Sequence, residues 1–224
     1  MQIWQHLRRQ EFQQVTDSSN LNETITTTID LLRHGDVEGG RKYRGQLDDP
    51  LSELGWQQLR RATQNKQEWQ HIITSPLKRC ADFSAELASK YRLPLKIESE
   101  FKEISFGLWE GKTADELLSL APDEIKQYWN DPVNETPPQG ESLSNFETRV
   151  KKSWQKMLKD FQGKHILLIS HAGVMRIILC HILKMPVSEL FKLDIGLAKA
   201  SRIQIVHAGH ESWPRLIFHG SEFI

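Results

Sequence analysis

Short apolar runs rich in β-branched residues recur along the chain and predict six strands. They cover residues 25–32, 71–74, 93–98, 165–170, 202–206 and 215–218. The run "ILLI" within 165–170 is continuous, which is typical of a strand covered on both faces. The last two runs lie close together in the sequence and predict an antiparallel hairpin at one edge of the sheet.

Helical patterns lie between these runs. They predict helices over residues 52–69, 76–91, 144–161 and 173–183. Ser144 and Glu147 have the spacing of a capping box at the start of the third helix. Strands that alternate with helices predict an α/β fold with a mostly parallel sheet.

Residues 99–143 break this alternation and contain two short helical pieces. We interpret them as a helical insertion that lies over the active site, at one end of the sheet, within a domain of residues 25–224. Residues 1–24 are polar and glutamine-rich, and we expect them to form an N-terminal extension.

Composition narrows the function classes. The chain has 224 residues, with 29 basic and 29 acidic side chains, so no long-range positive field favours nucleic acid as a partner. No apolar run is long enough to cross a membrane, and the first residues contain no apolar h-region, so we do not expect them to be a secretory signal. Cys80 and Cys180 lie far apart and are expected to be buried free thiols, which is consistent with a cytoplasmic location.

Polar clusters follow three of the predicted strands. Arg33 and His34 follow the first, Arg79 follows the second, and His171 follows the strand at 165–170. Ligands of open α/β sheets bind beyond the carboxyl ends of the strands, so these four side chains are expected to converge there.

The chemistry of this set fits a phosphoryl group. Arginine offers a planar fork of donors to phosphate oxygens, and glycines such as Gly35 and Gly173 allow the backbone to approach an anion. A neutral imidazole can carry the phosphoryl group covalently. Glu103 and Glu110 are the candidates for the acid that protonates a leaving alkoxide.

The motifs "LLRHG", "SPLKR", "EISFGLWEG", "PPQGES" and "ISHAG", in this order, resemble those of the histidine phosphatase superfamily, in its phosphoglycerate mutase-like branch. The resemblance covers about residues 27–206 and implies a three-layer αβα fold. It implies that His34 is the nucleophile, that Arg33 and Arg79 bind the phosphoryl oxygens, and that Glu103 is the proton donor. His171 would donate a hydrogen bond to the transferring group, and Glu110 would support the acid. No metal and no cofactor are implied.

The sequence departs from the family after Gly35. Many members have a hydroxyl residue and an asparagine there, whereas this chain has Asp36-Val37-Glu38-Gly39-Gly40. Arg44 could compensate, and Gln46 is a further candidate for a substrate contact. Trp109 could line a pocket for a flat base or belong to the core.

Within the family the chain is most similar to the α-ribazole phosphatases of cobalamin nucleotide-loop assembly, although "FGxWEG" also occurs in broad sugar-phosphate phosphatases. The expected function is a metal-independent phosphomonoesterase that acts on a small-molecule phosphomonoester. The alternatives are a sugar-phosphate phosphatase, a mutase that retains the phosphoryl group, and an inactive phosphate-binding or interaction module.

Overall fold

A computed structural model describes residues 24–65, 68–209 and 211–223. The predicted extension at residues 1–24 lies almost entirely outside the described residues. Six strands form one sheet in the order β3-β2-β4-β1-β5-β6. Strands β1 to β4 are parallel, whereas β5 runs antiparallel to β1 and β6 antiparallel to β5. The predicted edge hairpin is therefore confirmed.

The strands lie where the apolar runs predicted them, with small changes in length except in the last, which has 11 residues and extends beyond the predicted 215–218 at both ends. They are β1 (Ile25–Arg33), β2 (His71–Thr74), β3 (Leu95–Ile97), β4 (His165–Ser170), β5 (Ala200–Ala208) and β6 (Glu211–Ser221). Strand β4 has β1 on one side and β2 on the other, and residues 166–169 are fully buried. This position explains the continuous apolar run, since both faces of a central strand are covered.

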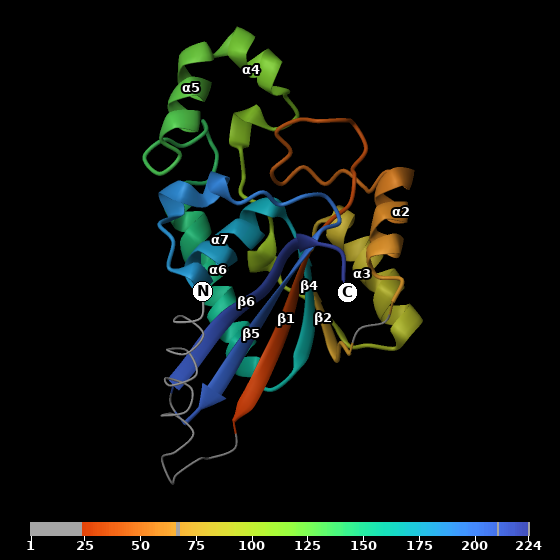
Figure 1. Ribbon diagram of the computed structural model, residues 1–224. Coiled ribbons are helices and arrows are strands. Elements are labelled where there is room, and N and C mark those ends of the chain that lie inside the picture. The colour runs from red at the N-terminus through yellow and green to blue at the C-terminus, as the bar shows by residue number, and fades with distance from the viewer. Residues whose placement is uncertain (1–23, 66–67, 210, 224) are drawn as a thin grey trace, which may run out of the picture.

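Helices cover both faces of the sheet, as Figure 1 shows. The main helices are α2 (Glu53–Ala62), α3 (Lys78–Tyr91), α4 (Ala114–Leu120), α5 (Pro122–Asn130), α6 (Leu143–Asp160) and α7 (Ala172–Leu183). Short 3-10 turns add η1 (Ser99–Phe101), η2 (Gly107–Trp109) and η3 (Val187–Lys192).

Two apolar clusters confirm the three layers. Ile29 and Leu31 of β1 pack in the same cluster as Phe146 of α6 and Ile178 of α7. Leu32, from the opposite side of the same strand, belongs to a second cluster with residues of α2 and α3. Alternate residues of a strand point to opposite faces, so β1 anchors both layers.

The helix ends differ from the prediction by one or two residues in most cases, and two of the differences have a clear physical reason. The helix predicted over 52–69 ends at Ala62, and Trp69 is instead buried with its indole N–H donating to Asp30 at 2.7 Å. The third predicted helix begins at Leu143, because Ser142 is its N-cap and accepts from the amide of Asn145. The capping box predicted at Ser144 was wrong.

The segment 99–143 extends over the carboxyl ends of the parallel strands. Helices α4 and α5 form the upper part of the molecule in Figure 1, above the point where β1 and β4 end. They have a core of their own, made of Trp109, Leu117, Ile125 and Tyr128. Trp109 is only 4% exposed and belongs to this core, and it lines neither of the two cavities described below.

Candidate active site

The site begins where β1 and β4 end side by side. Arg33 pairs with Ser170 in the parallel register, and the amide of His34 donates to the Ser170 carbonyl at 3.0 Å. The next residue on each strand is a histidine. The rings of His34 and His171 lie edge to face with their centroids 5.3 Å apart. The two histidines predicted to converge therefore do so.

His34 is held in one tautomer by its own neighbour. Its Nδ1 lies 2.7 Å from the carbonyl oxygen of Gly35. A carbonyl can only accept, so Nδ1 carries the proton and Nε2 carries a lone pair. Burial, together with the positive charges of Arg33 and Arg79, lowers the pKa of His34 well below its usual value. The ring is therefore neutral near pH 7, which is the form that can act as a nucleophile.

Arg33 keeps a donor unused. Its Nη1 donates to the Ile195 carbonyl at 2.5 Å. Its Nε is buried and is the one such side-chain atom without a hydrogen-bond partner in the described part of the chain. An unpaired buried N–H is costly, so this Nε is a candidate donor to an anionic ligand.

Arg79 is 1% exposed and fixes the neighbouring loop. Its Nη1 and Nη2 each donate at 2.7 Å, to the carbonyls of Leu47 and Gly45 respectively. Its Nε donates to Nδ1 of His171 at 3.3 Å. One N–H remains on each Nη for a ligand. Arg79 thus joins the loop after β1 to the residue that follows β4.

His171 has partners on both ring nitrogens. Because Nδ1 accepts from Arg79, the proton lies on Nε2, which is 2.7 Å from Oγ of Ser75. Burial, followed by the charge of Arg79, lowers its pKa well below the usual value. The hydrogen bond that was predicted from His171 to a phosphoryl group stays a prediction, because the structure pairs this N–H with Ser75.

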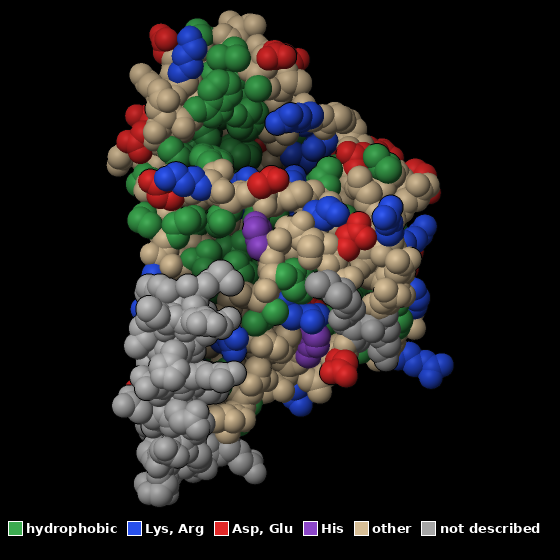
Figure 2. All heavy atoms as spheres, in the orientation of Figure 1, with side chains coloured by type: hydrophobic (Ala, Val, Ile, Leu, Met, Phe, Trp, Pro, Cys, Tyr) green, Lys and Arg blue, Asp and Glu red, His purple; other side chains and the backbone are tan. Residues whose placement is uncertain are grey.

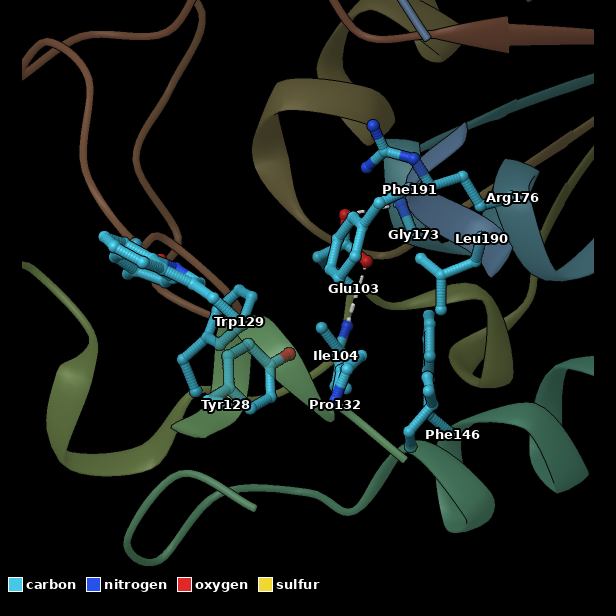
Figure 3. A pocket seen from close by; sticks show the side chains of 13 residues that line it. Glu103, Ile104, Tyr128, Trp129, Pro132, Phe146, Gly173, Arg176, Leu190 and Phe191 are labelled. Carbon is cyan, nitrogen blue, oxygen red and sulfur yellow. Dashed lines mark hydrogen bonds between the residues drawn. The ribbon is translucent and has the colours of Figure 1, made fainter. Parts of the chain in front are cut away.

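The side chain of Glu103, from the segment between η1 and η2, lies against the N-terminus of α7. Its two carboxylate oxygens accept from the amides of Ile104 and Gly173, each at 3.0 Å, as the dashed lines in Figure 3 show. The N-terminus of α7 therefore holds this carboxylate, and helix N-termini favour negative charge. A Cβ on residue 173 would lie 2.2 Å from Oε1 of Glu103, so the approach requires glycine.

Glu110 braces two loops and makes no contact of its own with the cavity. Its Oε1 accepts from the amides of Gln46 and Phe106, at 2.9 and 3.0 Å, and from the hydroxyl of Ser105 at 3.3 Å. Gln46 donates its side-chain amide to the Glu103 carbonyl at 3.2 Å. The observed contacts of Gln46 thus position Glu103, and the substrate contact proposed for it stays a prediction.

A cavity of about 810 Å³ opens above these groups. Arg33, His34, Arg79 and Glu103 line it, together with residues 41–45 and parts of α4 and α5. In Figure 2 blue basic side chains gather beneath the green apolar surface of the upper part. His171 and Gln46 are not among the lining residues.

Arg44 lines this cavity but is anchored by protein groups. Its Nε pairs with Asp49 at 2.9 Å, and its Nη2 donates to the carbonyls of Glu38 and Gly40. These contacts fix the loop whose sequence departs from the family. Arg41 and Lys42, which flank the cavity beside Arg44, add positive charge. Arg41 was not identified from the sequence.

Gly35 has a packing role. A Cβ there would lie 2.3 Å from the Gly55 carbonyl of α2, so the two glycines bring the helix against the end of β1. Asp36, next in the chain, accepts from the Ser52 hydroxyl at 2.5 Å. The residues after Gly35 thus contact α2, and the expected backbone approach of Gly35 to an anion is not what makes glycine necessary here.

Arg176 is a further charged residue that the sequence analysis missed. It lies on α7, its Nε donates to the Leu193 carbonyl at 3.0 Å, and its guanidinium faces a second cavity beside Glu103. The sequence signal was weak, because a single arginine in the helix after "HAG" also fits a surface position.

Across the described ranges, no three His, Cys, Asp or Glu side chains are grouped to hold a metal ion. None of the described helices has both the length and the apolar character needed to cross a bilayer. Cys80 and Cys180 are buried and unpaired, as predicted.

The chain is similar in sequence to several known proteins. The chain is 29% identical over 191 residues to a bifunctional protein of Mycobacterium tuberculosis, covering 83% of this chain and 52% of that protein. The chain thus spans about half the length of this protein and of two further mycobacterial relatives that it matches equally well. It is 28% identical over 179 residues to phosphoserine phosphatase 1 of Hydrogenobacter thermophilus, covering 78% of this chain and 85% of that enzyme.

A solved structure shares the fold. The α-ribazole phosphatase of Shigella flexneri superposes with a TM-score of 0.78 at 24% identity, covering 88% of this chain and 98% of that one. The family model for the histidine phosphatase superfamily, branch 1, matches residues 29–213, which include every residue of the cavity described above. The chain belongs to the histidine phosphatase superfamily, branch 1.

Proposed function

We propose that the protein is a metal-independent phosphomonoesterase that works through a phosphohistidine at His34. One observation carries the proposal. Nε2 of His34 is a free lone pair in a neutral ring, and Arg33, which lines the same cavity, has an unpaired buried N–H. A nucleophile beside unsatisfied cationic donors is the arrangement that transfer of a phosphoryl group requires.

The reaction has two balanced steps. Nε2 of His34 attacks phosphorus, the bond from phosphorus to the ester oxygen breaks, and the protonated form of Glu103 gives its proton to that oxygen. The alcohol leaves. The Glu103 carboxylate then takes a proton from water, whose oxygen attacks the phosphohistidine and releases inorganic phosphate. Arg33 and Arg79 offset the negative charge of the transferring group.

The first substrate we propose is α-ribazole 5′-phosphate. The motif "FGLWEG" and the compact insertion support it by resemblance to the α-ribazole phosphatases, whose member from Shigella flexneri has the same fold. Three aromatic side chains at the cavity, Tyr43, Phe106 and Trp129, also suit a substrate with a flat base.

A second candidate is a phosphatase for sugar phosphates or phosphorylated acids. The cavity contains Arg41, Lys42 and Arg44 in addition to the phosphate-binding pair. Such an array favours substrates with a second anionic or strongly polar group. The similarity to phosphoserine phosphatase 1 of Hydrogenobacter thermophilus supports this candidate as well.

The test measures phosphate release from purified protein in the presence of a chelator. The substrates are α-ribazole 5′-phosphate, sugar phosphates and phosphoserine, and the His34→Ala variant runs in parallel. A preference for α-ribazole 5′-phosphate that the variant loses supports the first candidate. Turnover confined to the other substrates supports the second. No turnover on any substrate contradicts the proposed activity and favours a phosphate-binding module.

A cytoplasmic location is also proposed. Cys80 and Cys180 are buried free thiols, and unpaired cysteines are typical of reducing compartments.

A further inference from the structure

A second cavity of about 430 Å³ lies beside the catalytic one. Five aromatic residues besides Tyr43 line it: Phe106, Tyr128, Trp129, Phe146 and Phe191. Its only charged lining side chains within the described residues are Glu103 and Arg176. Figure 3 shows the aromatic rings grouped around Glu103 and Ile104. The volume and the apolar lining are those of a small-molecule site.

The two cavities meet at the proton donor. Tyr43, Glu103, Phe106 and Trp129 line both of them. The residues whose amides hold the Glu103 carboxylate, Ile104 and Gly173, also line the second cavity. The carboxylate therefore lies at the junction, with the nucleophile in one cavity and an apolar space in the other.

We propose that this second cavity, the leaving-group pocket, holds the alcohol portion of the substrate and selects phosphomonoesters whose alcohol carries an aromatic ring. This inference rests on the proposed function and deepens it. The proton donor must contact the ester oxygen, so the group attached to that oxygen extends to the Glu103 side of the phosphoryl group. There the apolar pocket offers space for it, next to the aromatic side chains that the two cavities share.

The walls of the pocket come from separate parts of the chain. Tyr128 and Trp129 belong to α5, Phe146 to α6 and Phe191 to η3. The Trp129 indole N–H donates to the Tyr43 hydroxyl at 2.6 Å, which satisfies its polar atom and leaves its ring face for contact. Trp129 and Phe191 are 42% and 52% exposed, so an aromatic ligand would remove apolar surface from water.

Arg176 adds one polar point to this apolar space. Its guanidinium lies 5.5 Å from the centroid of the Phe191 ring, and the hydrogen bond from its Nε to Leu193 orients it. Its Nη atoms can donate to an oxygen substituent of the alcohol. The pocket thus suits an alcohol that has an aromatic ring and a further oxygen substituent that can accept from Arg176. A small and fully hydrated alcohol does not fit it as well.

The test separates binding from turnover. Calorimetry compares 3-phenylpropylphosphonate with propylphosphonate, in which a methylene replaces the ester oxygen so that no hydrolysis occurs. The full chain is used, with Phe191→Ala as the pocket variant. Ile97→Ala is the control, because Ile97 is an exposed residue of β3 that lines neither cavity.

We expect 3-phenylpropylphosphonate to bind the wild-type protein at least about tenfold more tightly than propylphosphonate does. Burial of an apolar group in a fitted pocket discriminates between ligands by this factor or more. Phe191→Ala should lose most of that ratio, and Ile97→Ala should keep it. Equal affinities for the two phosphonates in the wild-type protein would overturn the inference. So would a ratio that Phe191→Ala leaves unchanged.

Turnover of ethyl phosphate and 2-phenylethyl phosphate completes the experiment. Hydrolysis of both esters at equal kcat/KM, with equal phosphonate affinities, would keep the phosphatase and reject the pocket. A binding ratio without hydrolysis of either ester would reject the proposed activity, while the pocket would remain as a binding site.

Discussion

The carboxylate of Glu103 lies against the backbone of Gly173, at a place where any side chain on residue 173 would collide with it. The amide of Gly173 donates to Oε2 of Glu103 at 3.0 Å, and a Cβ at position 173 would lie 2.2 Å from Oε1. The sequence analysis assigned this glycine to the approach of a bound anion. The anion that approaches is instead the carboxylate of Glu103, the proposed proton donor.

Gly173→Ala should therefore lower activity without lowering stability. The added methyl displaces the Glu103 carboxylate, and loss of a general acid lowers the rate by about 10²-fold or more. Alanine is the better helix former by about 1 kcal/mol, which offsets the strain in α7. Steady-state kinetics and thermal unfolding measure the two effects.

Glu103→Gln is the matched comparison for Gly173→Ala. If Gly173 acts through Glu103, the double variant should be no slower than Glu103→Gln alone. Losses that multiply in the double variant would contradict this account.

Lysine substitutions of Arg33 and Arg79 should differ in their effect on stability. Arg79 donates to the carbonyls of Gly45 and Leu47, so Arg79→Lys should cost about 2–4 kcal/mol of stability by losing charged hydrogen bonds. Arg33→Lys loses one hydrogen bond, from Nη1 to the Ile195 carbonyl, but it also removes a buried Nε that has no partner, so it should change stability by less than about 1 kcal/mol. Both should weaken binding of inorganic phosphate.

Urea unfolding and phosphate titration by calorimetry check this pair. The two variants serve as controls for each other, since each keeps the positive charge. An equal loss in the free energy of unfolding in both variants would contradict this prediction, because the different hydrogen bonds of the two arginines would then contribute equally to stability.

Stability should fall as the pH drops below the usual pKa of histidine. His34 and His171 have pKa values well below 6.5 in the folded protein, because burial and the neighbouring arginines disfavour the charged rings. The unfolded chain therefore binds more protons than the folded one below pH 6.5. The contribution is complete above that pH and is lost as the pH falls toward the folded pKa values.

The expected slope is about 1.4 kcal/mol per pH unit for each histidine. Denaturant unfolding between pH 5 and 7.5 (a range set by the usual histidine pKa of about 6.5) measures it. The His34→Asn variant should show a shallower slope. A slope unchanged by that substitution would mean that His34 is protonated in the folded protein or titrates normally.

Asp30 should matter for folding and not for catalysis. It is fully buried, and Arg202 donates to its two oxygens at 2.7 and 2.9 Å, with His165 and Trp69 as further partners. These hydrogen bonds outweigh burial and hold its pKa below the usual value. Asp30→Ala should cost about 3–5 kcal/mol, because it removes the buried carboxylate that accepts from Arg202, His165 and Trp69.

Asp30 lines neither cavity, so the folded variant should keep its kcat/KM at a temperature well below its melting point. A large fall in kcat/KM with little loss of stability would contradict this assignment.

The sequence was sufficient for the fold and for the convergence of the main site residues. Apolar runs located all six strands, and the carboxyl ends of parallel strands share one edge, so Arg33, His34, Arg79 and His171 had to lie close together. Their convergence depends on local periodicity and topology alone. The choice of Glu103 over Glu110 as the acid came from the resemblance to the histidine phosphatase superfamily, because the residues by themselves left both open.

The remaining features depend on tertiary contacts that no local pattern encodes. Arg33 and Arg79 look alike in sequence, yet carbonyls from a separate loop occupy the donors of Arg79 and leave Arg33 with a free one. The helix predicted to reach residue 69 ends early because Trp69 turns inward to Asp30. Trp109 could line a pocket or a core, and only the packing of the insertion places it in the core.

The central claim is that His34 carries the phosphoryl group, and trapping that intermediate tests it most directly. The Glu103→Gln variant, which lacks the group that activates water, is mixed with a phosphomonoester that the wild-type protein hydrolyses and is quenched in alkali. Peptide mass spectrometry then locates the modification. The account predicts one phosphoryl group on the peptide that contains His34, and none when His34→Ala is added to the variant. Turnover of the same ester by His34→Ala at the wild-type rate, or a phosphoryl group on another residue, would contradict it.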